Sequence, residues 1–210
     1  MFAVLLSASL VIERLAASAS AGEARGWLAG GQNHLAILVG LNLVPFAGIA
    51  FLWFIGVVRD RMGAHEDRFF ASVFLGSGLL FVAMLFVTGA MAAGLMATVT
   101  ASSGSSLATV VWQYGRDVSY TLVTIYAMRM AAVFMIATAT ITLRTAFMPR
   151  WLGITGYACA LVLLLTVGSW PWVELIFPIW VLLISVHILA VGSRAASGVA
   201  TPQSASRAAG

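Results

Sequence analysis

Charge is the scarcest feature of this sequence. Charged residues make up 9% of its 210 residues, and all 11 basic residues are arginine, because lysine is absent. Hydrophobic residues make up 61%, whereas a soluble domain is usually about 45–50% apolar and about 25% charged. A soluble globular enzyme and a disordered chain are therefore excluded. The single cysteine, Cys159, excludes a scaffold held by intrachain disulfides. The composition indicates an integral membrane protein.

The net charge of +4 comes from 11 arginines against seven acidic residues. A basic chain raises the question of nucleic acid, whose binding needs arginines or lysines gathered on one face or along one helix. The arginines of this chain are scattered along the sequence. The sequence therefore predicts no nucleic-acid partner, and the lipid bilayer is its expected surroundings.

Five apolar segments approach or exceed the length of roughly 20 residues that a helix needs to cross a membrane. The predicted spans cover about 35–58, 69–99, 119–143, 151–167 and 172–191. The second is longer than a crossing needs, so it either tilts or projects past the membrane surface. The sequence thus predicts an all-α, polytopic transmembrane helical bundle over 35–191, followed by a disordered cytoplasmic tail over 192–210.

The arginines also predict the orientation, because basic loops are retained on the cytoplasmic side. If the connection 59–68 is cytoplasmic, seven arginines lie on that side and three on the other. The seven are Arg59, Arg61, Arg68, Arg144, Arg150, Arg194 and Arg207. We expect a multi-pass protein of the bacterial inner (plasma) membrane with a cytoplasmic C-terminus. Arg59, Arg61 and Arg68 are also expected to contact anionic lipid headgroups.

Residues 1–34 are predicted to form an N-terminal apolar segment and an outer loop. Residues 2–12 are mostly apolar but too short to span. One interpretation is a signal peptide with AASASA at 16–21 as its cleavage region, although the basic N-terminal stretch of such peptides is missing. The interpretation we favour is part of a sixth helix that begins upstream of Met1, because it leaves 13–33 outside, as the five spans require.

Two ionisable residues fall within or beside the predicted spans, where charge is costly and often functional. Arg129 lies about ten residues, or roughly 15 Å, into the third span, and Glu174 stands at the outer end of the fifth. A long arginine side chain directed toward the start of its helix would reach outward. The sequence therefore predicts an Arg129–Glu174 pair. We favour a pair that fixes helix packing, and the alternative is a substrate or proton site.

Two prolines are predicted to interrupt helices beside polar residues. Pro178 removes the hydrogen bond to the carbonyl of Glu174, and Pro45 frees the carbonyl of Leu41 next to Asn42. Transporters use broken helices of this kind at binding sites. Most prolines in membrane helices only bend them, so a structural kink is the favoured interpretation at both positions.

The sequence contains no pattern for catalysis, a cofactor or a metal. His34, His65 and His187 have no accompanying cysteine pair or HExxH spacing, and His34 and His187 are predicted near opposite membrane faces. The connection 59–68 holds three arginines and three acids, but a ten-residue connector gives no evidence of acid and base groups that converge in a pocket. We therefore predict no catalytic, cofactor-binding or metal-binding residues.

Four stretches together are similar to a known group of proteins. They are NLVPFAGIAFLWFIGVVRDRMG at 42–63, EDRFFASVFLGSGLLF at 66–81, RMAAVFMIATATITLRTAFMPRWLGITGYACALVLLL at 129–165 and WPWVELIFPIWVLLISVHIL at 170–189. They resemble a group of small, uncharacterised multi-pass integral membrane proteins of high-GC bacteria. The resemblance covers about 40–190 and implies a membrane helical bundle, in which similar chains begin with a further full helix. It implies no activity, ligand or catalytic residue.

Three functional hypotheses follow. The first is a non-enzymatic accessory or partner-binding membrane protein, which associates with another membrane protein or with copies of itself. The second is a small-molecule or proton-coupled carrier that uses Arg129, Glu174 and Asn42, and the third is a membrane-embedded enzyme. A carrier predicts a polar cavity that reaches Arg129 and Glu174, whereas a partner-binding protein predicts a tightly packed interior.

Overall fold

The computed structural model describes Ser7 and the ranges 31–62, 68–101, 106–145, 148–166 and 172–199. Within these ranges the chain is helical almost throughout and contains no strand. The predicted all-α class is therefore confirmed for the described residues. The two interpretations of the N-terminal segment, His65 and the tail beyond residue 199 lie outside them.

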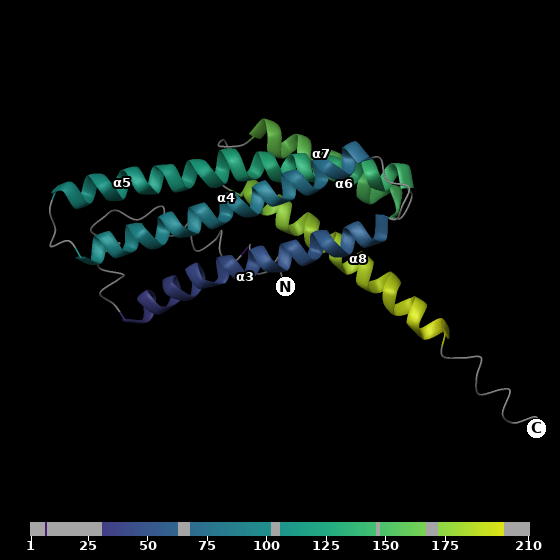
Figure 1. The fold of residues 1–210 in the computed structure, drawn as a ribbon, viewed down its shortest axis with the longest axis horizontal. Coiled ribbons are helices and arrows are strands. Elements are labelled where there is room, and N and C mark those ends of the chain that lie inside the picture. The colour runs from purple at the N-terminus through teal and green to yellow at the C-terminus, as the bar shows by residue number, and fades with distance from the viewer. Residues whose placement is uncertain are drawn as a thin grey trace, which may run out of the picture.

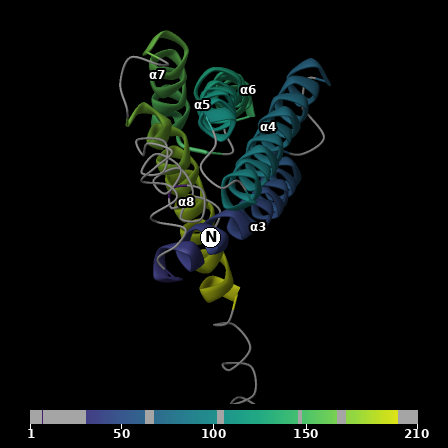
Figure 2. The same cartoon turned by 90° about the vertical axis from the view of Figure 1, so that its left-hand side faces the viewer.

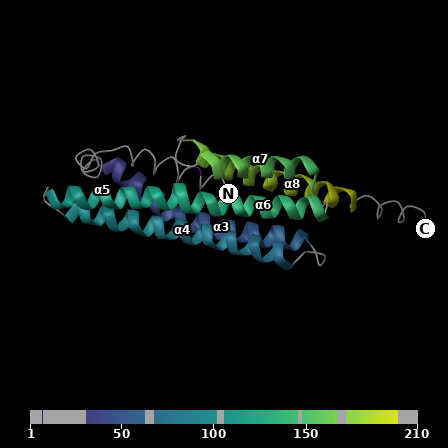
Figure 3. The same ribbon diagram turned by 90° about the horizontal axis from the view of Figure 1, so that it is seen from above.

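The helices follow one another as a series of long antiparallel rods (Figure 1). They are α3 (Gly31–Met62), α4 (Arg68–Ala101), α5 (Ser106–Thr121), the π-helix η1 (Leu122–Ala127), α6 (Met128–Thr145), α7 (Arg150–Thr166), the 3-10 helix η2 (Val173–Leu175) and α8 (Ile176–Val199). Because α5, η1 and α6 are continuous, they form a single rod. Figure 3 shows this rod running alongside α4, and Figure 2 shows it between α4 and α7.

Four helical segments of the described chain are long and apolar enough to cross a membrane. They cover Asn42–Asp60, Arg68–Thr98, Thr109–Thr145 and Val173–Val191. The remaining predicted span, 151–167, corresponds to a shorter apolar helix over Arg150–Leu165, so the count of five spans is not confirmed. Helix α8 also continues to Val199, past the predicted end of the span at Val191.

The apolar helical segment that contains the third predicted span begins at Thr109, ten residues before the predicted start at Ser119. The segment 107–118, which contains Gln113, Arg116 and Asp117, lay outside the predicted span. This segment is nevertheless helical, since it is amphipathic and one side packs on α4. Trp112 and Gly115 lie buried on that side.

Phenylalanines from four helices fill the centre of the bundle. The ring of Phe51 in α3 lies 5.3 Å from Phe81 of α4, 5.2 Å from Phe134 of α6 and 5.7 Å from Phe177 of α8, measured between centroids. All four side chains are fully buried. Offset and edge-on contacts at these distances are the geometry that aromatic rings favour. We call these four residues the phenyl layer, and they close the interior at this level.

One end of the bundle gathers arginines. Arg59 lies near the end of α3 and Arg68 begins α4, while Arg144 lies near the end of α6 and Arg150 begins α7. The guanidinium carbon of Arg144 lies 4.6 Å from the ring centroid of Phe70 in α4, so the end of α6 and the start of α4 are neighbours. We call this the arginine end, on the right in Figure 1.

The long helices extend beyond α7 and α8 at the opposite end (Figure 1). The 34 residues of α4 make a helix of about 51 Å, whereas the hydrocarbon core of a bilayer is about 30 Å thick. A tilt of more than about 50° would be needed to contain α4, and membrane helices tilt by about 0–40°. In a bilayer, part of α4 would therefore project past the core, and so would part of the α5–η1–α6 rod, which is longer still. We call residues 89–101 of α4 and 106–121 of α5 the distal extension.

Candidate functional site

Arg129 and Glu174 lie at the same level of the bundle. Arg129 precedes Phe134 by five residues on α6, and Glu174 precedes Phe177 by three residues at the start of α8. The rings of Phe134 and Phe177 are in contact, 6.2 Å apart. Both charged residues are thus displaced from the phenyl layer toward the distal extension, by about 7.5 Å and about 5 Å.

The side chains of these two residues have different surroundings. Arg129 is exposed and Glu174 is half-buried. In the described part of the chain they form no ion pair with each other. The Arg129–Glu174 pair stays a prediction. The two residues lie at a similar depth in the bundle, but their side chains are not in contact.

The two prolines occupy different helical contexts. Pro45 lies inside α3, which continues through it, and Asn42 one turn earlier is exposed. Pro178 is buried in the first turn of α8, directly after the 3-10 helix η2. Because η2 and α8 are continuous, the backbone N–H that Pro178 lacks would have bonded to the carbonyl of Glu174. The interruption expected beside Glu174 coincides with the change from 3-10 helix to α-helix between Leu175 and Ile176.

A groove of about 260 Å³ lies along the distal half of the α5–η1–α6 rod. None of the five predicted site residues lines it, and Arg129 lies one turn beyond its last lining residue, Tyr126. Its lining residues recur at helical spacing and form one continuous face of α5 and η1. They are Tyr114, Asp117, Val118, Thr121, Leu122 and Tyr126. We call this the tyrosine groove. Tyr114 and Tyr126 stand at its two ends.

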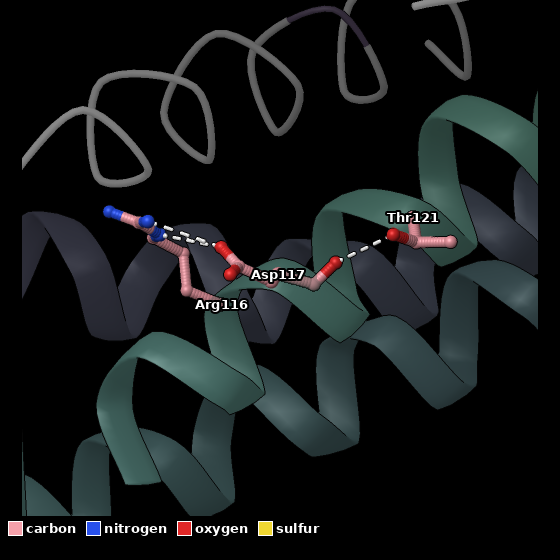
Figure 4. Close-up of polar contacts among 3 residues, drawn as sticks. All are labelled: Arg116, Asp117 and Thr121. Carbon is pink, nitrogen blue, oxygen red and sulfur yellow. Dashed lines mark hydrogen bonds and ion pairs between the residues drawn. The ribbon is translucent and has the colours of Figure 1, made fainter. Parts of the chain in front are cut away.

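Asp117 carries the charge of this groove and is held by its neighbours (Figure 4). Its carboxylate accepts hydrogen bonds from Nε and Nη2 of Arg116 at 3.2 and 3.1 Å. The Thr121 hydroxyl donates to the backbone carbonyl of Asp117 at 2.8 Å. The Asp117 side chain is 69% exposed, and exposed ion pairs contribute only about 0–1 kcal/mol. The carboxylate can therefore exchange Arg116 for another cation at little cost.

The membrane-side end of the groove is built on a π-helix. Leu122–Ala127 form η1, and the backbone N–H of Met128 bonds to the carbonyl of Val123, five residues earlier. Such segments are rare and frequently occur at functional sites. The hydroxyl of Thr124 donates to the carbonyl of Tyr120, four residues before it, and this back-bonding is a known source of local helix distortion.

The opposite side of α5 explains why this helix forms. A Cβ on Gly115 would lie 2.7 Å from Cδ1 of Leu95 in α4, so the two helices approach closely. Trp112 and Ser119 are buried on the same side of α5, seven residues apart. Neither the Trp112 Nε1 nor the Ser119 Oγ has a hydrogen-bond partner. Packing on α4 thus turns the other side, which bears Tyr114 and Asp117, outward.

Sequence reasoning missed the tyrosine groove because it predicted spans only, and half of the residues that line the groove lie between the predicted spans 69–99 and 119–143. A signal was present. Tyr114, Asp117 and Thr121 recur at i, i+3 and i+7, opposite a second set, Trp112, Gly115 and Ser119, with the same spacing. Two faces with that periodicity predict an amphipathic helix.

Among the described residues, no group of three or more His, Cys, Asp or Glu side chains is placed to hold a metal ion. Comparison of the chain with protein-family models, with curated proteins and with solved structures gives no match. The function must therefore be argued from the chemistry of the chain's own residues.

Proposed function

We propose that the chain is a multi-pass protein of the bacterial inner membrane, with the arginine end and the C-terminus in the cytoplasm. The support is the gathering of Arg59, Arg68, Arg144 and Arg150 at one end of the bundle, because arginine-rich connections resist translocation. In this orientation the distal extension and the tyrosine groove face the outer side. Contact of Arg59, Arg61 and Arg68 with anionic headgroups belongs to the same proposal.

In this proposal α7 also crosses the membrane, which brings the number of crossings to five. Its 17 residues make about 25 Å, slightly less than the hydrocarbon core. It leaves the arginine end at Arg150 and leads toward the start of α8, whose helix then returns (Figure 1). Membership in the group of small membrane proteins of high-GC bacteria remains part of the proposal, and the stretches 42–63 and 66–81 that support it fall largely in α3 and α4.

The protein acts, in our proposal, as a non-enzymatic binding protein that recognises a ligand or partner through the outer face of α5 and η1. One observation carries this proposal. The phenyl layer closes the interior at its own level, while the tyrosine groove lies on an outer face of the rod. A carrier needs a polar path near the midplane. Instead, the buried hydroxyls of Ser77, Thr88 and Thr138 donate to carbonyls of their own helices.

A small-molecule or proton-coupled carrier is the second candidate. It is favoured by the common level of Arg129 and Glu174, since a change of rotamer or helix position could bring the two charges together. The carrier and the binding protein differ in one measurable property, which is access of water to the level of Thr138, a buried residue of α6.

Single cysteines introduced in a Cys159→Ala background test this difference. A membrane-impermeant maleimide added to intact cells should label Thr121→Cys in the groove. It should label Arg150→Cys only after the membrane is permeabilised. Thr138→Cys should stay unlabelled from both sides, with labelling of the denatured protein as the control for its reactivity. Labelling of Thr138→Cys in the folded protein would favour the carrier, and external labelling of Arg150→Cys would reverse the orientation.

A further inference from the structure

We propose that the tyrosine groove binds an organic ammonium cation with an apolar stem. The ammonium group lies against Asp117 and Tyr114, and the stem lies along Val118 and Leu122 toward Tyr126. This inference rests on the proposed function, because it names the ligand class of the same outer surface.

The charge of the groove selects the sign of the ligand. Asp117 is the charged residue among the six that line the groove, and none of the six is basic. Arg116, which does not line the groove, neutralises the Asp117 carboxylate by donating two hydrogen bonds to it. A ligand cation can take the place of the Arg116 guanidinium, whereas an anion would meet the carboxylate without a compensating lining group.

The aromatic rings select the kind of cation. Tyr114, three residues before Asp117, is 71% exposed, and Tyr126 is 54% exposed, so both ring faces are accessible. Tyrosine faces attract cations, and binding of quaternary ammonium groups is the best-known use of this attraction. A small hydrated metal ion would gain little from such a surface. An ammonium group that carries methyl or alkyl substituents contacts both the ring and the carboxylate.

The shape of the groove accounts for the stem. Twelve residues separate Tyr114 from Tyr126, a distance of about 18 Å along the helix axis. A compact cation cannot contact both ends. The surface between them presents Val118 and Leu122 on successive turns, so the part of the ligand that follows the ammonium group is apolar.

The position of the groove agrees with an amphiphilic ligand. The α8 span begins at Val173, four residues outward of Phe177. On the α5–η1–α6 rod, the residue four positions outward of Phe134 is Met130, which we take as the hydrocarbon boundary on that rod. Tyr126 then lies about 6 Å outside the hydrocarbon boundary and Tyr114 about 24 Å. Leu122 and Val118 lie about 12 and 18 Å outside the boundary, beyond the roughly 5–8 Å that headgroups occupy on each side, so only the free end of the stem, at Tyr126, reaches headgroup depth. An aqueous alkylammonium ion and the ammonium of a lipid headgroup share this chemistry.

The closing experiment measures binding to the full-length protein in nanodiscs of a neutral glycolipid, by isothermal titration calorimetry. The probes are tetramethylammonium, butyltrimethylammonium and hexyltrimethylammonium, with hexanol as the neutral control. We expect affinity to rise about two- to fourfold for each added methylene that the groove covers. Added NaCl should weaken the binding of each cation. Equal affinity for hexanol and hexyltrimethylammonium would overturn the proposal.

Four variants locate the site. Asp117→Asn should lower the affinity for hexyltrimethylammonium about two- to fivefold, and Tyr114→Leu should do so to a similar extent. Arg116→Gln should raise it about two- to fivefold, because the carboxylate loses its competing partner. Tyr120→Leu is the matched control, since Tyr120 is exposed on the same helix but does not line the groove, and its affinity should stay within twofold. Unchanged affinity in Asp117→Asn, with an unchanged melting temperature, would overturn the assignment.

A third arm separates the two sources of the cation. If a lipid headgroup is the ligand, phosphatidylcholine in the nanodisc should compete with hexyltrimethylammonium and lower its apparent affinity. No competition assigns the site to an aqueous cation. Failure of all cations to bind, together with the expected cysteine labelling, would reject the ligand class alone. Labelling of Thr138→Cys would reject the binding-protein proposal itself.

Discussion

The ring of Trp180 in α8 packs directly on the backbone of Gly156 in α7. A Cβ at Gly156 would lie 3.1 Å from Cζ2 of that ring and 3.3 Å from the Cβ of Ala139 in α6. Trp180 is 2% exposed, so its ring has little room to move. Small residues of this kind let membrane helices approach closely where no hydrophobic effect drives them together. The shortest apolar helix of the described chain is thus joined to its two neighbours through one glycine.

Replacing Gly156 with leucine should separate α7 from α6 and α8. Overpacking of a closed contact costs about 1–3 kcal/mol, so the melting temperature of the purified protein should fall. Gly94→Leu is the matched control, because a Cβ at Gly94 meets no atom within 4 Å. Equal effects of the two substitutions would show that the contact at Gly156 does not hold α7.

Truncation of Phe51 should be the most damaging single change in α3. Its ring is fully buried and contacts three other helices, and Phe→Ala substitutions in cores cost about 3–5 kcal/mol. Phe46→Ala on the same helix is the control, since Phe46 is 62% exposed. Thermal unfolding in detergent compares the two. A loss of stability in Phe46→Ala that matched Phe51→Ala would indicate that the outer face of α3 is covered by protein.

Composition and apolar length predicted much of this fold. The start of the fourth predicted span lies within one residue of the start of α7, and the predicted end of the fifth is the end of the apolar stretch at Val191. The helix begins before the predicted start at Ser119 for a physical reason. Hydropathy averages the two sides of a helix, so the charges of Arg116 and Asp117 concealed the apolar side of α5 that packs on α4.

The site was harder to predict than the spans. The cost of a charge in a membrane directs attention to Arg129 and Glu174, which are isolated in apolar sequence. The tyrosine groove depends instead on the π-helix η1, which sets how the faces of α5 and α6 are aligned. Its i+5 hydrogen bond from Met128 to Val123 is specified by neither apolar length nor charge, which are the features that predicted the spans.

Replacing Trp112 with phenylalanine should leave stability within about 1 kcal/mol of the unmodified protein. The buried Nε1 of Trp112 has no hydrogen-bond partner, and an unsatisfied buried donor costs about 1–3 kcal/mol. Removing it offsets the loss of ring volume. Trp112→Ala, which removes the ring as well, should cost about 3 kcal/mol or more. Thermal unfolding of both variants checks this. A Phe variant as unstable as the Ala variant would mean that the indole N–H has a partner.

Deletion of Ile125 should preserve the bundle and remove the groove. A π-helix holds an additional residue within an otherwise α-helical rod, so a deletion inside η1 can restore α-helical hydrogen bonding while α5 and α6 keep their packing faces. The lining of the groove would then lose the register between Thr121 and Tyr126. Deletion of Ile136 in α6 is the control, because each later residue turns by about 100° and Thr138 and Ile141 leave the core. Membrane abundance and melting should survive the first deletion and not the second. Loss of folding in both would show that η1 does not absorb a change of register.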